Sequence, residues 1–109
     1  GVGAYMPSVF FSFNSVSVTD ANYLRLAAIA NALKANPEVN IILTGHSDAS
    51  GAEEYNKTFG QRRADGVAKE LTQIFGIDAS RIETMSSGEA EPLANGKSNI
   101  NRRVDVAVK

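Results

Sequence analysis

The feature that most constrains the fold is a short apolar run, Ile41-Ile42-Leu43, which lies between two longer segments of helical periodicity, residues 20–34 and 52–75. The surrounding segment Val39 to Thr44 is typical of a strand that is covered on both faces. A strand that follows one long helix and precedes another needs crossover connections. This arrangement predicts a partly parallel sheet with helices packed against it.

The remaining elements follow from local pattern. Thr19 or Asp20 is expected to cap the first helix, and Asn36-Pro37 is expected to end it. Gly76 is expected to end the second helix, and close packing against the sheet would explain one of its interior glycines, Gly60 or Gly66. Three further strands are predicted at Val9–Phe13, Arg81–Met85 and Val104–Val108, with a polar loop over Ser86–Asn101. The predicted fold class is α/β (α+β), with the order β-α-β-α-β-β, a mixed four-stranded sheet and two main helices on one face.

Composition removes several classes of function. The 109 residues suit one domain, and we expect residues 9–109 to form it, with 1–8 as a linker. The chain has no Cys and one His, which excludes thiol chemistry and multi-histidine metal sites, and no cofactor is expected. The formal net charge of −1 argues against nucleic acid as a partner. Since the chain begins at Gly1, we expect a domain of a longer protein whose targeting segment lies outside this sequence.

An acid and an arginine in the stretch from Gly45 to Ala64 are the leading candidates for a site. Asp48 follows the central strand in a glycine-containing loop, at the sheet edge where ligands gather. Arg63 shares a helix face with Phe59 and Val67, whereas Arg62 points about 100° away. Together the two charges could hold the ammonium and the carboxylate of an amino acid. The alternative is structural: an internal salt bridge or backbone bonds for Arg63, and a turn or cap for Asp48.

Other polar residues give weaker signals. His46 and Asp48 form an H-x-D pair, but no nucleophile motif accompanies it, so we expect a histidine hydrogen-bonded to nearby backbone. Asn56 could offer its amide to a peptide or lie in solvent. The pair Arg102-Arg103 could hold an anion, form a structural pair or stay solvated. The aromatic residues Phe10, Phe11 and Phe13 are expected in the core.

Several separated motifs, spread from Val9 to Lys109, resemble the OmpA C-terminal-like family of peptidoglycan-binding domains. The pattern is G-H-S-D-x-x-G-x-x-x-Y-N, then R-A, G-I-D-A-S-R-I, G-E-x-x-P and N-R-R-V. The matching residues are Gly45, His46, Asp48, Gly51, Tyr55, Asn56, Arg63, Ala64, Gly76, Ile77, Gly88, Pro92, Asn101, Arg102, Arg103 and Val104. The chain departs from the pattern at Ser12 and Asn14, where acids are frequent, and at Ser47 and Gly60, where threonine and serine are usual.

The resemblance implies a non-catalytic domain that binds peptidoglycan in the periplasm of a Gram-negative bacterium and anchors an outer-membrane or other envelope protein to the cell wall. In the family, the acid and the helix arginine grip the meso-diaminopimelate residue of the stem peptide, which assigns Asp48 and Arg63 here. Asn56 and Arg102 are implied as lesser contacts. We expect backbone amides near Gly51 to fix the peptide, and Asn14 to contribute through its amide.

Two other functions remain open from the sequence. One is a hydrolase that uses His46 and Asp48. The other is a structural or protein-interaction module of the cell envelope, in which Asp48 and Arg63 form an internal salt bridge. The membrane attachment of the parent protein and its oligomeric state are left open by the sequence.

Overall fold

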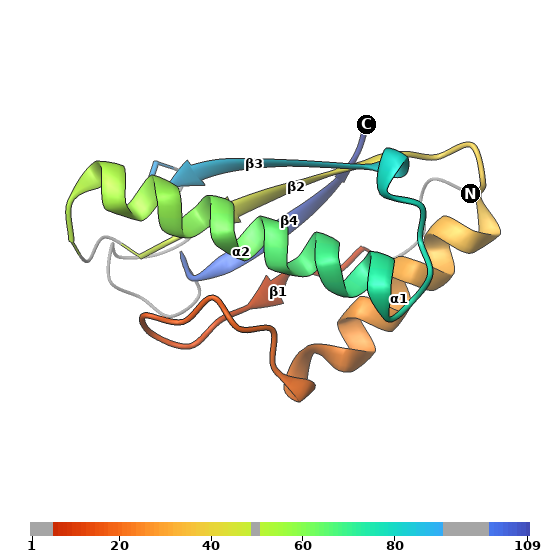
Figure 1. Ribbon diagram of the computed structural model, residues 1–109, viewed down its shortest axis with the longest axis horizontal. Helices are drawn as coiled ribbons and strands as arrows, with labels where there is room; N and C mark the ends of the chain where they lie inside the picture. Colours follow the sequence, from red (N-terminus) through yellow and green to blue (C-terminus); the bar gives the residue numbers. More distant parts are fainter. Residues whose placement is uncertain (1–5, 49–50, 91–100) are drawn as a thin grey trace.

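The computed structural model describes residues 6–48, 51–90 and 101–109, and these form a four-stranded sheet with two main helices (Figure 1). In chain order the elements are β1 (Val9–Phe10), α1 (Tyr23–Ala35), β2 (Ile41–His46), α2 (Glu53–Gln73), β3 (Ile82–Gly88) and β4 (Arg103–Val108). Two short 3-10 turns, Asp20–Asn22 and Ala79–Arg81, precede α1 and β3. The predicted element order is confirmed.

The strands lie in the order β1-β4-β2-β3. β2 runs parallel to β3, while β4 runs antiparallel to both β1 and β2. The last strand of the chain is therefore inserted between the first strand and the middle one. This places the start of β4 beside the segment that follows β1, although the two are about 90 residues apart in sequence.

Both helices pack on one face of the sheet. The core joins Leu26, Ile29 and Leu33 of α1 with Val67 and Leu71 of α2 over the inward-facing side chains of the strands. Each fully buried Leu or Ile side chain stabilises the fold by about 1.5–3 kcal/mol. Figure 1 shows α2 lying along the sheet, with α1 near the C-terminal end of α2. A ring contact between Tyr23 and Phe75, with centroids 5.4 Å apart, joins the same two regions.

The expectation that the central strand is covered on both faces is wrong. Burial alternates along β2: Ile41 and Leu43 face the helices and are fully buried, whereas Ile42 and Thr44 are half-buried. No helix among the described residues covers that second face. The strand is rich in apolar residues because it is an interior strand of the sheet, between β4 and β3, and not because it lies between two helical layers.

Several predicted boundaries also need correction. The first strand ends at Phe10, after which Asn14 adopts a left-handed conformation with φ 54°. Neither Thr19 nor Asp20 caps α1, which begins at Tyr23 after the 3-10 turn. The predicted loop over Ser86–Asn101 begins too early, because β3 continues to Gly88. Residues 91–100 of that loop lie outside the described part of the chain.

Helix α2 approaches β2 very closely through two glycines. A Cβ atom on Gly45 would lie 1.7 Å from the carbonyl oxygen of Gly60, and one on Gly60 would lie 2.7 Å from the carbonyl oxygen of Gly45. Side chains at these positions are therefore excluded by the backbone itself. This confirms the prediction that close packing explains one of the helix glycines, and identifies it as Gly60.

Candidate ligand-binding site

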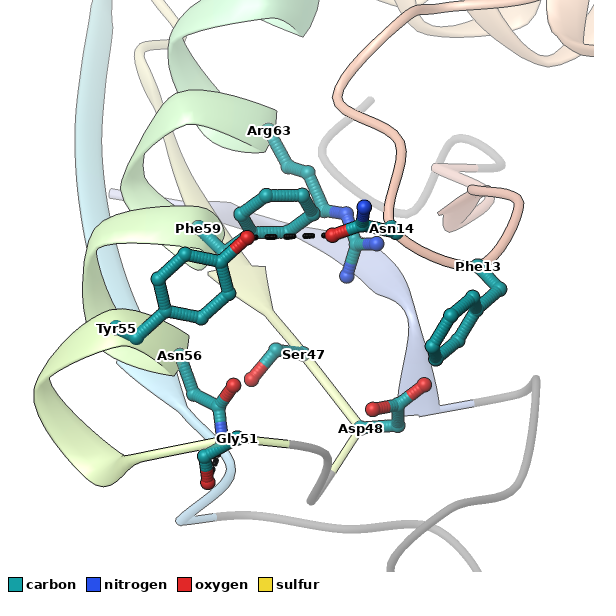
Figure 2. A pocket seen from close by; sticks show the side chains of 9 residues that line it. All are labelled: Phe13, Asn14, Ser47, Asp48, Gly51, Tyr55, Asn56, Phe59 and Arg63. Carbon is teal, nitrogen blue, oxygen red and sulfur yellow. Dashed lines mark hydrogen bonds between the residues drawn. The ribbon is translucent and has the colours of Figure 1, made fainter.

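A cavity of about 270 Å³ lies at the carboxyl end of β2. Three segments line it: Phe13 and Asn14 after β1, Ser47 and Asp48 after β2, and Gly51, Tyr55, Asn56, Phe59 and Arg63 at the start of α2 (Figure 2). Five of the six residues predicted to bind ligand therefore lie around one cavity. The sixth, Arg102, reaches this group through a salt bridge to Asp48.

Arg63 is almost fully buried, with 1% of its surface exposed, and backbone carbonyls hold it in place. Nε donates to Ser15 O at 2.9 Å, Nη1 to His46 O at 3.0 Å and Nη2 to Ser12 O at 3.3 Å. The guanidinium also lies over the rings of Phe59 and Phe11, at 4.8 and 5.3 Å from the centroids. A guanidinium has five N–H donors. Three are used here, which leaves one on Nη1 and one on Nη2 for an acceptor beyond the described residues.

The charge of Arg63 is maintained despite its burial. Burial lowers the pKa of its guanidinium to about 10, the nearby Asp48 carboxylate opposes that shift, and the charge of Arg102 adds to it. A group with this pKa stays protonated at neutral pH. The cavity therefore contains a cation that water solvates poorly and that favours an anionic partner.

Asp48 forms its described salt bridge with Arg102 and not with Arg63. Arg102 Nη1 lies 3.1 Å from Asp48 Oδ2, and both side chains are largely buried. The alternative prediction, an internal salt bridge between Asp48 and Arg63, is therefore wrong. The reason is topological: β4 is inserted next to β1, so Arg102 arrives beside Asp48, while carbonyl oxygens already fix the guanidinium of Arg63.

Asn56 is buried at 2% exposure, so solvent exposure is excluded as its state. Its Nδ2 donates to Glu89 Oε1 at 2.9 Å and to Gly51 O at 3.4 Å. These bonds orient the amide so that Oδ1 is an acceptor on the cavity side (Figure 2). Gly51 has φ +87°, a conformation that L side chains rarely adopt, and this turn starts α2 directly below the cavity.

The rim of the cavity is aromatic. Phe13 and Tyr55 are exposed at 64% and 52%, and the Tyr55 hydroxyl donates to Asn14 Oδ1 at 3.2 Å across the opening (Figure 2). The prediction of a core position is right for Phe11 and wrong for Phe13, because the left-handed turn at Asn14 directs the preceding ring away from the core. Side chains alternate between the two faces only within a strand, so this alternation does not predict the direction of a side chain in such a turn.

Sequence reasoning missed Ser47, which lines the cavity beside Asp48. Its Oγ is buried and has no hydrogen-bond partner among the described residues. An unsatisfied buried hydroxyl costs free energy unless a ligand or water completes it. The available signal was its position between His46 and Asp48 at the end of an apolar strand.

His46 belongs to a different cluster. Its Nε2 lies 3.2 Å from Asp105 Oδ2, so its ring contacts a carboxylate, and the prediction of a hydrogen bond to nearby backbone is wrong. Ser8 Oγ donates to the other oxygen of Asp105 at 2.7 Å, and Arg103 Nε donates at 3.0 Å. Burial alone would raise the pKa of Asp105, but the bonds from His46, Ser8 and Arg103 outweigh it and lower the pKa to about 2.

This cluster does not have the geometry of an activated nucleophile. Asp105 lies between the hydroxyl and the imidazole, whereas activation requires the imidazole to contact the hydroxyl directly. Across the described ranges, no group of three or more His, Asp or Glu side chains is placed to hold a metal ion. In the same ranges no helix is both long enough and apolar enough to cross a membrane.

The motifs and the fold agree with the comparisons to known proteins. The OmpA family model matches residues 10–105, and the chain belongs to that family. It is 30% identical to Outer membrane porin F of Pseudomonas aeruginosa over 93% of this chain and 30% of that protein. It is 37% identical to the peptidoglycan-associated lipoprotein of Haemophilus influenzae over 82% of this chain and 58% of that protein.

A solved structure shows the same fold. The crystal structure of the peptidoglycan-associated lipoprotein from Burkholderia pseudomallei has a TM-score of 0.87 with this chain at 35% identity, covering 94% of this chain and 89% of that one. The chain spans less than two thirds of the length of the curated relatives it matches. The similarity therefore concerns one domain of those proteins.

Proposed function

We propose that this domain binds peptidoglycan without catalysis, through the meso-diaminopimelate residue of the stem peptide, and tethers an envelope protein to the cell wall from the periplasm. The observation that carries the proposal is the cavity that holds the buried guanidinium of Arg63 next to the carboxylate of Asp48. The peptidoglycan-associated relatives support the polymer as the partner.

The chemistry of the cavity suits the free end of diaminopimelate, which carries an ammonium and a carboxylate on one carbon. The remaining Nη1 and Nη2 protons of Arg63 would donate to the carboxylate. Asp48 and the Oδ1 atom of Asn56 would accept from the ammonium. Ser47 Oγ would gain the partner that it lacks. Lysine has no carboxylate at this position and would leave the Arg63 donors unpaired in a buried site, which gives selectivity for one wall chemistry.

The test uses Asp48→Asn, which keeps the shape and removes the charge. We expect wild-type protein to pellet with diaminopimelate-containing sacculi and not with lysine-type sacculi. Loss of one charge-assisted bond of roughly 1.5–3 kcal/mol predicts binding weaker by about 10- to 100-fold for the variant. Circular dichroism would confirm that the variant is folded.

Asp20→Asn is the matched control, because it makes the same chemical change at an exposed position outside the cavity. It should bind as the wild type does. Equal binding of Asp48→Asn and Asp20→Asn, or equal binding to both kinds of sacculi, would contradict the proposed site. Incubation with sacculi should release no soluble fragments, and release would contradict the non-catalytic assignment.

A further inference from the structure

A second cavity, of about 440 Å³, lies beside the first one and carries two arginines. Its lining residues are Phe10, Phe11, Ser12, Thr19, Ala21, Asn22, Arg25 and Arg102. None of these is Asp or Glu, so the described lining has two guanidinium groups and no carboxylate. A hollow of this composition attracts an anion.

Both arginines have N–H groups that donate to no described residue. Arg25 has one described contact, with its guanidinium carbon 5.3 Å from the centroid of the Phe10 ring. Arg102 uses Nε to donate to Phe11 O at 3.1 Å and Nη1 to pair with Asp48. Its Nη2 makes no hydrogen bond to any described residue. A stacked guanidinium keeps its N–H edge available for a planar carboxylate.

The two cavities share a wall. Residues 10–12 line the second cavity and residues 13–14 line the first one. Arg102 lines the second cavity while its Nη1 contacts Asp48 of the first, and its charge is close enough to lower the pKa of Arg63. One ligand could therefore reach from Arg63 past Asp48 and Arg102 to Arg25.

The charges of the shared region favour a ligand with a second carboxylate. Among the described residues that line the two cavities, Arg63, Arg102 and Arg25 supply three positive charges, and Asp48 supplies one negative charge. A zwitterionic end group is neutral and would leave this excess uncompensated. A stem peptide that ends at diaminopimelate carries an additional carboxylate on the main-chain carbon of that residue.

We propose that Arg25 and Arg102 form a second subsite that binds the main-chain terminal carboxylate of the peptide whose side-chain end occupies the first cavity. This inference rests on the proposed function and deepens it. The domain would then prefer stem peptides that end in a free carboxylate over peptides in which that group is amidated or linked onward.

The test titrates two synthetic tripeptides, L-Ala-γ-D-Glu-meso-diaminopimelate with its main-chain carboxylate either free or amidated, by calorimetry at low salt. We expect the free acid to bind about tenfold more tightly, the size of one charge-assisted hydrogen bond. Arg25→Gln should reduce this preference to about twofold or less, while the amidated peptide binds the variant as it binds the wild type. Arg25→Lys keeps the charge and should keep part of the preference.

Lys34→Gln is the control, because it removes one positive charge from an exposed position at the other end of α1. It should preserve the tenfold preference. Equal affinity of the wild type for both peptides would overturn the second subsite but not the proposed function, provided that Asp48→Asn still weakens binding by at least about tenfold. An unchanged preference of Arg25→Gln for the free-acid peptide would also overturn the second subsite. Failure of both peptides to bind the wild type would overturn both proposals.

Discussion

The two ends of β2 each have an arginine that binds backbone carbonyls, and the two differ in what else surrounds them. At the amino end, Arg81 donates to Leu33 O and Asn36 O at 2.8 Å each, and to Val39 O at 2.7 Å. At the carboxyl end, Arg63 also donates to three carbonyls. Arg63, however, has a carboxylate and two aromatic rings close by and borders the cavity with Asp48.

The comparison teaches that carbonyl bonds alone do not distinguish a structural arginine from a candidate for ligand binding. Arg81 joins the end of α1 and the following loop to the start of β3, and its bonds serve that connection. Each arginine keeps two N–H groups beyond its carbonyl bonds, but Arg81 is half-buried whereas Arg63 is almost fully buried. Arg63 also lines a cavity with Asp48 and with Ser47, whose buried hydroxyl has no partner among the described residues. Burial beside a cavity, and not the number of unused donors, is what favours Arg63 over Arg81 in the proposed site.

The largest effect should come from Arg63→Leu. It removes the buried N–H groups that donate to three backbone carbonyl oxygens. We therefore expect the free energy of unfolding to fall by about 3–5 kcal/mol. Binding to sacculi should disappear as well. Urea unfolding followed by circular dichroism measures the first effect. Arg62→Leu on the same helix is the control, since Arg62 is exposed, and a similar loss there would contradict the role assigned to Arg63.

Arg81→Leu should have an intermediate effect and separate the two ends. Arg81 itself is half-buried whereas Arg63 is almost fully buried, so water can replace part of what its side chain donates. We therefore expect a loss of about 2 kcal/mol in the free energy of unfolding. Peptide affinity should stay within about twofold of the wild-type value, because Arg81 is at the opposite end of β2. A large drop in affinity without unfolding would show that the two ends are coupled.

The smallest effect is a pH dependence of the free energy of unfolding, and it arises from Asp105, near the carboxyl end of β2. The pKa of Asp105 is about 2 in the folded protein, below its ordinary value of 3.8. A lowered folded pKa means that the charged carboxylate stabilises the fold above pH 3.8, and that this contribution is lost as the pH falls from 3.8 toward 2. Its side chain is 39% exposed, so solvent screening reduces the contribution to about 1 kcal/mol.

Urea unfolding at pH 6 and pH 2 would measure this contribution. The stability gap between the wild type and Asp105→Asn should narrow by about 1 kcal/mol at the lower pH. The gap between the wild type and Arg81→Leu should stay constant, since that substitution removes no group that titrates in this range. If the stability difference between the wild type and Asp105→Asn were the same at both pH values, the lowered pKa of Asp105 would be refuted.

Much of the fold and the site could be predicted because their signals are local. Helical phasing selected Arg63 over Arg62, and the apolar run placed Asp48 at the end of a strand. The salt bridge from Arg102 could not be predicted in this way, because it depends on the insertion of β4 between β1 and β2. The bond from Asn56 to Glu89 joins residues 33 positions apart, and it depends on how α2 packs against the end of β3. The exposure of Phe13 depends on a turn that strand periodicity does not describe.

The contact between Gly45 and Gly60 fixes the distance between α2 and β2 at the cavity. Asp48 lies three residues after Gly45, and Arg63 lies three residues after Gly60. The point where the two backbones touch therefore sets how far apart the acid and the base are held. Two residues without side chains, neither of which lines the cavity, thereby limit the size of the head group that the proposed site can admit.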